Sequence, residues 1–341
     1  MLKYIFHRLV MMIPTLFGIT LLSFVIINLA PGSPIEQKIM QMRFGGAMGV
    51  GSAGGQGDMG VSTEVLEALK KQYGFDKPMH VRYGIWLKNI ATLDFGESFS
   101  YEEPVVDVIA SKFPVSLQFG IISLLLTYMV CIPLGIAKAV KDGNTFDVVS
   151  SFLLMILYSI PPLILAIILR VYLAGGAFLD WFPLGDLYSD EYYDLTTWEK
   201  IIDRIHHFVL PLVCYVIGNF TVLTFLMKNS LIEEIKLDYV RTARAKGLPE
   251  RVVYYKHALR NALIPIATGL ASFLGFFFAG SVIIEQVFNL DGMGLLSYKA
   301  ALDRDYNVIM GLIFFQSLLM LVGRFLSDIS YTLIDPRIDF S

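Results

Sequence analysis

Of the five histidines and two cysteines in the chain, one adjacent pair of histidines and the two cysteines are the candidates for a metal site or a redox pair. His206 and His207 are adjacent, while Cys131 and Cys214 lie in separate apolar runs. A zinc site needs about four ligands at short spacings, and no further His or Cys follows either pair at such a distance. We therefore expect no metal site. The histidines are interpreted as interfacial residues and the cysteines as small apolar packing residues.

No other group of residues fits catalysis. Ser52–Gln56 reads SAGGQ, which is similar to the nucleotide-sensing signature of transport ATPases, but the sequence contains no phosphate-binding GxxxxGK[ST] loop. The segment is interpreted as part of a flexible Gly-rich linker, Phe44–Val61. We expect that this chain has no catalytic residue and binds no cofactor.

Two polar side chains within apolar runs are candidates for a substrate path. Arg170 lies near the end of one run and can extend to the membrane surface, but a charge at membrane depth also favours a functional role. Asn219 can contact a substrate or, as an alternative, form a hydrogen bond between helices. Both roles stay open for both residues.

The largest charged feature is Asp238–Pro265, which reads DYVRTARAKGLPERVVYYKHALRNALIP. The pattern predicts a helix over Ile232–Ala245, a turn at Gly247 and a second helical piece that starts near Pro249. Scattered basic residues would be enough to bind anionic lipid headgroups. The regular helix–turn–helix pattern instead favours a rigid docking site for a cytoplasmic protein.

The composition around this segment is that of an integral membrane protein. Of 341 residues, 55% are hydrophobic and 17% charged, whereas a soluble domain carries roughly 25% charged residues. Apolar runs of about 20 residues can span a bilayer. Six such spans are predicted: Leu9–Ala30, Val115–Ala137, Val148–Ala174, Phe208–Met227, Leu263–Ile284 and Val308–Ser327.

Loop charges predict the orientation of these spans. Basic residues gather in 138–147 and 228–261, whereas 175–207 is acidic. By the positive-inside rule, the two basic loops and both termini face the cytoplasm. The predicted domains are 1–30 with the first span, a periplasmic segment 31–114, and a five-helix domain 115–341 that includes loop 228–262. Within the periplasmic segment, short helices are expected over Ser62–Tyr73 and Met79–Ile90.

The fifth predicted span carries a stripe of small residues, Ala267, Ala271, Gly275 and Ala279. Small residues at every fourth position let another helix approach closely. We expect this helix to pack inside a bundle or at a subunit interface.

The basic segment resembles the cytoplasmic loop of permease subunits of binding-protein-dependent ABC importers. That loop runs Glu-Ala-Ala, three residues, Gly, nine residues and Ile-x-Leu-Pro. Ala243, Gly247 and Leu259 match it. The departures from it, together with EQVFNLDGMGLLSYKAALDRDYNVIMG at 285–311 and SDISYTLIDPRID at 327–339, resemble the oligopeptide/dipeptide branch. The Gly-rich insertion is similar to that of Yej-type peptide permeases of Gram-negative bacteria.

The resemblance implies an all-α type I importer permease with six spanning helices that moves peptides into the cell. The implied partners are a second homologous permease, two ATPase subunits or one fused ATPase that hold ATP and Mg²⁺, a periplasmic substrate-binding protein, peptide and membrane lipids, with no nucleic acid. By position, the family implies that coupling to the ATPase falls to Asp238, Arg241, Thr242, Ala243, Ala245 and Gly247.

Three alternatives remain at this stage. A secondary transporter would show paired ionisable groups at mid-membrane and often repeated halves, and neither is visible in the sequence. An intramembrane enzyme would need a nucleophile–base or metal cluster within the spans. The third alternative keeps the same machinery but changes the cargo to a metal chelate, glutathione or a sugar.

Overall fold

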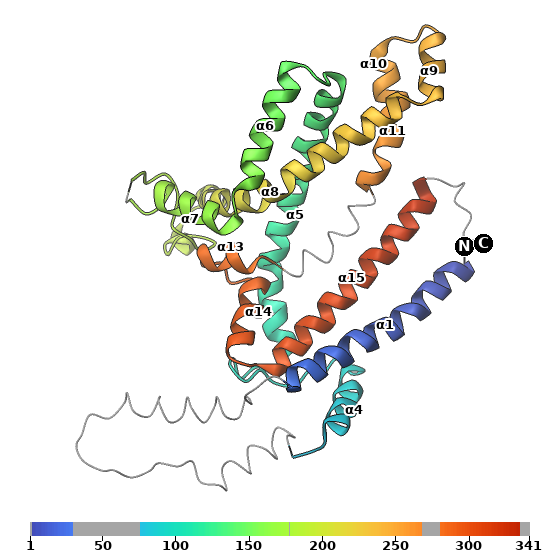
Figure 1. Cartoon of the computed structure of the whole chain (residues 1–341). Coiled ribbons are helices and arrows are strands. Elements are labelled where there is room, and N and C mark those ends of the chain that lie inside the picture. Colours follow the sequence, from blue (N-terminus) through green and yellow to red (C-terminus); the bar gives the residue numbers. More distant parts are fainter. Residues whose placement is uncertain (1, 30–75, 177, 268–279, 335–341) are drawn as a thin grey trace. The chain divides into compact units, whose positions relative to one another are not determined.

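Helices form almost all of the regular structure. The computed structural model describes residues 2–29, 76–176, 178–267 and 280–334. These residues contain two isolated β-bridges and no strand. In chain order (Figure 1) the helices are α1 (Leu2–Leu29), α4 (Met79–Ile90), α5 (Val105–Val140), α6 (Thr145–Ser159), α7 (Pro162–Leu173), the short 3₁₀-helix η1 (Tyr192–Asp194), α8 (Thr197–Ile235), α9 (Asp238–Ala245), α10 (Glu250–Val252), the π-helix η2 (Val253–Ala258), α11 (Leu259–Ala262), α13 (Val282–Val287), α14 (Met293–Leu302) and α15 (Tyr306–Ile334).

Four of the described helices are long and apolar enough to cross a membrane: α1, α5, α8 and α15. Their side chains agree with a lipid environment, because Ile26, Met129 and Phe152 are 65% to 69% exposed. Large apolar side chains at such exposure fit a surface that faces lipid instead of water. The prediction of an all-α integral membrane protein is confirmed. The predicted fifth span lies mostly in 268–279, outside the described residues.

The third predicted span, Val148–Ala174, is not one continuous helix in the structure. The structure has α6 and α7 instead, bent by 91° at the break between them. Ile160 and Pro161 are both extended there. Two consecutive prolines explain the break: each lacks an N–H group for the helix ladder, and each disfavours helical backbone at the residue before it.

The chain forms two compact units. Unit 1 comprises residues 113–295 with 1–6 and 319–341, and unit 2 comprises 7–112 and 296–318. In unit 2, α4 has the predicted bounds, and Tyr83 on it packs with Phe24 and Met310 while its hydroxyl lies 3.0 Å from the hydroxyl of Thr20. The buried carboxylate of Asp305 accepts hydrogen bonds from Ser98 Oγ and from the backbone at the start of α15.

Unit 1 has two apolar cores. One, here called the Met227 core, draws residues from α5, α8, α9, η2 and α11; its buried members are Cys131, Ile136, Ala139, Leu223, Met227, Leu231, Val240, Ala243, Val253, Ala258, Ala262 and Ile266. The other surrounds Phe119 and joins α5, α7, α8 and α13. Both cysteines are buried in these cores, as free thiols, as their interpretation as packing residues predicts.

Helices α5 and α8 meet closely at the Met227 core. A Cβ atom on Gly135 would lie 2.6 Å from Met227 Cβ and 2.9 Å from the backbone oxygen of Thr224. Since neither a Cβ atom nor a backbone oxygen can move aside, only glycine fits this position. This contact fixes the distance between α5 and α8, the two longest helices described.

Replacing Gly135 with Ala should therefore push α5 and α8 apart and destabilise the protein by about 1 to 3 kcal/mol, the usual cost of overpacking. The measurement is the thermal unfolding midpoint of the purified protein in detergent. Gly218→Ala is the matched control, because Gly218 is also helical but nothing lies within 4 Å of its Cβ position. An equal midpoint for the two variants would contradict the close contact.

Candidate functional site

The helix α9 projects from the end of α8 after a short break. Lys236 still has helical backbone, whereas Leu237 is extended and precedes the first turn of α9. The predicted continuous helix over Ile232–Ala245 is therefore wrong: it is two helices. The change of direction lets Val240 and Ala243 turn into the Met227 core, a tertiary effect that helix propensity does not reveal.

The six residues predicted to couple the chain to an ATPase fall on two sides of this site. Ala243 is buried against the Met227 core and anchors α9 to its own subunit. The other five are exposed: Asp238, Arg241, Thr242, Ala245 and Gly247. Val240, which the sequence did not single out, is fully buried beside Ala243. Their spacing of three residues, one helical turn, is the signal that could have found this anchor.

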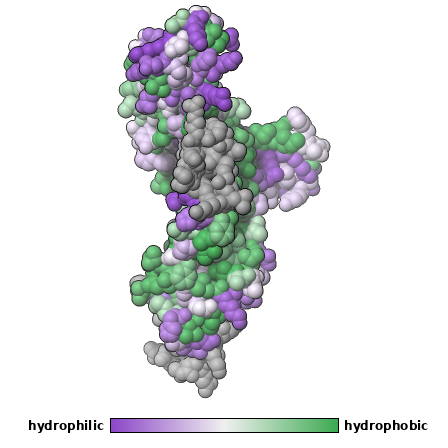
Figure 2. Space-filling model, turned by 90° about the vertical axis from the view of Figure 1, so that its right-hand side faces the viewer, coloured by the Kyte–Doolittle hydropathy of each residue, from purple (hydrophilic) through white to green (hydrophobic). Residues whose placement is uncertain are grey.

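The exposed side of α9 keeps its charges in solvent. The side chains of Arg241 and Asp238 lie 3.4 Å apart and are 69% and 96% exposed. A surface pair of this kind contributes little to stability, so both charges can reorient toward a partner. Figure 2 shows hydrophilic residues gathered over the end of unit 1 where α9 and α10 lie in Figure 1.

Gly247 ends α9 as predicted. Its φ of +75° is in the left-handed region, and its backbone N–H donates to the carbonyl oxygen of Arg244. Glycine adopts this conformation without the strain that a Cβ atom causes. Nothing lies within 4 Å of its Cβ position, so backbone conformation alone requires the glycine.

Two polar contacts hold the turn and the neighbouring helices in place. Arg244 Nε donates to Glu250 Oε1 over 2.9 Å, which lowers the pKa of Glu250 and raises that of Arg244. The hydroxyl of Tyr239 bonds to Glu234 and accepts from Asn261, and burial raises its pKa to about 12. The Arg244–Glu250 pair thus stays charged at neutral pH and is lost only as pH falls through the lowered pKa of Glu250.

The second helical piece is of mixed type. After α10, residues Val253–Ala258 form a π-helix that continues into α11. Its first and last residues, Val253 and Ala258, are both fully buried in the Met227 core. The wider turn of a π-helix frequently marks functional sites. Here it allows both residues to face the same core while Lys256 stays exposed.

A buried charge cluster ties α5, α6 and α8 together close to this site. Lys138 is fully buried, and its ammonium lies 3.0 Å from Asp147 Oδ1 and donates to Ser150 and Ser151. Lys228 on α8 pairs with Asp147 at 2.7 Å and with Asp142 at 2.8 Å. The sequence treated Lys138 and Lys228 as loop charges. Two features of the sequence could have indicated this buried cluster. Both lysines stand at helical spacing from apolar residues, and two aspartates, Asp142 and Asp147, follow shortly after Lys138.

The two candidates for a substrate path are not brought together. Arg170 is half-buried and lines a cavity of about 330 Å³ with Leu184 and Val287. Asn219 is exposed on α8 and does not line that cavity. In the small-residue stripe, Ala267 is half-buried, whereas Ala271, Gly275 and Ala279 lie outside the described residues. These roles stay predictions.

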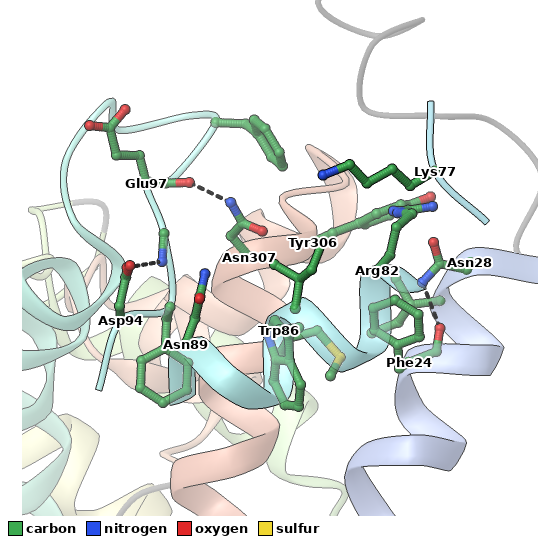
Figure 3. Close-up of a pocket in the computed structure, with 16 residues that line it drawn as sticks. Phe24, Asn28, Lys77, Arg82, Trp86, Asn89, Asp94, Glu97, Tyr306 and Asn307 are labelled. Atoms are coloured by element: carbon green, nitrogen blue, oxygen red, sulfur yellow. Dashed lines mark hydrogen bonds between the residues drawn. The ribbon is translucent and has the colours of Figure 1, made fainter. Parts of the chain in front are cut away.

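Unit 2 contains a larger cavity of about 450 Å³ between the end of α1, α4 and the start of α15. Figure 3 shows Phe24 and Trp86 on its wall, with Lys77, Arg82 and Asn307 around them. The indole N–H of Trp86 is buried without a hydrogen-bond partner among the described residues. The cavity can take a ligand that combines apolar and polar groups, but none of the predicted site residues lines it.

The histidines are held by backbone carbonyls: His206 Nε2 bonds to Trp181 O, and His207 Nδ1 lies 2.8 Å from Asp203 O. Throughout the described part of the chain, no group of three or more His, Cys, Asp or Glu residues is placed to hold a metal ion.

A family model described as "Binding-protein-dependent transport system inner membrane component" matches residues 131–340, well over half of the chain. The chain belongs to this family. The matched part of the permease runs from α5 through α9 and its anchor in the Met227 core to the last helix. The predicted resemblance to importer permeases is thus confirmed, and the protein is a multi-pass inner-membrane transport component.

Full-length relatives narrow the branch. The permease is 45% identical to the "Peptidoglycan transport system permease protein YejB" of Agrobacterium fabrum and 42% identical to the "Inner membrane ABC transporter permease protein YejB" of Escherichia coli. Each alignment covers 99% of this chain and 98% of the relative. The "Oligopeptide transport system permease protein AppB" of Bacillus subtilis is 35% identical over 100% of both chains. The predicted likeness to the Yej-type and oligopeptide/dipeptide branch is confirmed.

Substitutions of the two alanines of α9, one buried and one exposed, should show which face of this helix is anchored in the core. Ala243→Leu should lower the unfolding midpoint of the purified permease, because the added carbons must enter a filled core. Ala245→Leu should leave it unchanged, since that side chain faces solvent. Differential scanning fluorimetry of both variants in detergent measures this, and a midpoint drop for Ala245→Leu alone would contradict the assigned faces.

Proposed function

We propose that this permease is one of two membrane subunits of an ATP-driven importer that moves peptides from the periplasm to the cytoplasm. One observation supports this most strongly: an exposed, charged helix, α9, is anchored firmly to the core of a chain whose full-length relatives include an oligopeptide transport permease. Such a helix can receive force from a partner without bending away from its own subunit.

The proposed complex contains a second homologous permease, two ATPase subunits or one fused ATPase, and a periplasmic substrate-binding protein. ATP and Mg²⁺ bind to the ATPase, and this chain binds no cofactor. Both termini and α9 face the cytoplasm, which the basic residues in 228–261 favour. The segments 31–114 and 285–307 then face the periplasm and contact the binding protein.

In this mechanism the bundle alternates between inward-open and outward-open states. The balance between the two states is biased by ATP, through the ATPase, on one side of the membrane and by loaded binding protein on the other. Asp238, Arg241, Thr242, Ala245 and Gly247 present the contact surface on α9, while Val240 and Ala243 transmit its displacement into the Met227 core. Arg170 and Asn219 remain candidates for contact with the cargo.

A second cargo is supported by one comparison. The relative at 45% identity is named a peptidoglycan transport permease, so peptidoglycan fragments, which carry short peptides on a sugar, are the alternative to free peptides. Both cargoes need a path wide enough for a peptide chain.

Uptake by a deletion strain decides between these cargoes. Cells that lack this chain should fail to accumulate radiolabelled tetra-alanine, and the wild-type chain should restore accumulation. An excess of unlabelled peptidoglycan fragments should compete if both cargoes share the path. Normal uptake of labelled tetra-alanine by the deletion strain would contradict the proposed import of peptides.

The coupling surface is tested at Gly247 by two substitutions of different conformational tolerance. Gly247→Val should lower uptake several-fold, since a β-branched residue is strained at a φ of +75° and displaces the end of α9. Gly247→Asn should retain most of the uptake, because asparagine tolerates the left-handed region. Copurification of the ATPase with each variant gives the second measurement, and equal binding and uptake for both variants would count against this role of the turn.

A further inference from the structure

The carboxylate of Glu285 is buried and connects three helices, α5, α8 and α13. Glu285 directly follows the fifth predicted span. Glu285 on α13 is 0% exposed. Its Oε1 accepts hydrogen bonds from Ser116 Oγ at 2.8 Å, from the Ser281 backbone N–H at 3.1 Å and from the Tyr215 hydroxyl at 3.2 Å. Its Oε2 accepts from the Leu295 backbone N–H at 2.9 Å. The donors come from α5, α8 and both ends of segment 281–295.

Ser116 makes this arrangement a continuous network. Its hydroxyl donates to Glu285 and accepts from the Met293 backbone N–H at 2.7 Å. A Cβ atom on Gly292 would lie 2.6 Å from Ser116 Oγ and 2.7 Å from Glu285 Cδ. The space around the carboxylate is therefore filled, and any added atom would separate the partners. Glu285, Ser116, Tyr215 and the backbone of 281–295 are here called the Glu285 joint.

Segment 281–295 is also connected to the part of the chain between α7 and α8. The backbone N–H of Asp186 donates to the carbonyl oxygen of Phe288 over 2.9 Å, and the side chain of Asn289 donates to the carboxylate of Asp186. The acidic connection between α7 and α8 is thus tied to segment 281–295. Figure 1 shows α13 beside α7 and α8, away from α9 and α10.

The helices that hold the joint continue toward the coupling surface. Ser116 lies on α5 and Tyr215 on α8, the same helices that meet at Gly135 and are linked by Lys138, Asp147 and Lys228. Beyond these contacts, α8 leads into α9. A displacement of segment 281–295 therefore reaches α9 through two helices that are fixed to each other along the way.

We propose that Glu285 is a positioning residue for transport: it fixes segment 281–295 to α5 and α8 so that binding-protein contact on this segment changes the position of α9. The inference rests on the proposed function. Glutamate is required because all four contacts are donors, and only a carboxylate offers acceptor oxygens in both directions. In Glu285→Gln, an amide N–H₂ group faces a donor N–H, which leaves buried polar groups unpaired.

The experiment uses the whole complex in proteoliposomes, with tetra-alanine as cargo, and measures ATP hydrolysis with and without the peptide-loaded binding protein. Glu285→Gln should keep basal hydrolysis and assembly but lose at least five-fold of the stimulation by binding protein. Gly292→Ala should give the same defect, although the carboxylate is intact. Tyr215→Phe, which removes one long hydrogen bond, should cause a smaller loss and keeps the test valid if a stronger variant fails to assemble.

Glu199→Gln is the matched control, because Glu199 is an exposed carboxylate that caps α8 through Thr196; its stimulation should equal that of the wild type. Unchanged stimulation in Glu285→Gln and Tyr215→Phe would overturn the inference alone. A parallel fall of assembly, basal and stimulated hydrolysis with an unchanged ratio would also overturn it, since that result indicates only a structural role. Absence of stimulation in the wild-type complex would overturn the proposed function and the inference with it.

Discussion

The structure of unit 1 depends on the close contact between α5 and α8. At Gly135 the two helices approach until no Cβ atom fits, and beside this contact the buried ammonium of Lys138 meets Asp147, which also pairs with Lys228. Lys138 is enclosed and cannot reach water, so removing Asp147 would leave its buried ammonium without a carboxylate partner at high cost. Packing and charge therefore impose the same geometry, and α5, α6 and α8 are held in one arrangement at this end of the unit.

The remaining parts of unit 1 attach to this pair of helices by two different kinds of contact. At the Met227 core the attachment is apolar: Val240 and Ala243 fix α9, and Val253 and Ala258 fix the π-helix. At segment 281–295 it is polar, and the Glu285 carboxylate replaces the apolar anchor. Apolar contacts tolerate small sliding movements, whereas a hydrogen-bonded carboxylate has defined directions. Both α9 and segment 281–295 are thus fixed to the same pair of helices, the first by apolar packing and the second by directional hydrogen bonds.

Much of the fold follows from the sequence, because long apolar runs and turn residues act locally. The spans, α4 with its bounds and the turn at Gly247 are set by periodicity, by length and by the conformational freedom of glycine. The errors came where distant residues decide. Leu237 breaks the predicted helix, and this break lets Val240 reach the Met227 core.

The site shows the same division between local and distant effects. The sequence predicted the turn at Gly247 but gave Ala243 the same role as its exposed neighbours, since the burial of Ala243 depends on α5 and α8, which are far along the chain. The Glu285 joint is harder to predict, because Ser116, Tyr215 and Glu285 are separated by 70 to 169 residues. In the sequence, a glutamate directly after an apolar run is interpreted as a charge at the membrane boundary. Its burial becomes a requirement only when four donors converge on it, and in the proposed mechanism this convergence makes segment 281–295 and α9 parts of one mechanical element.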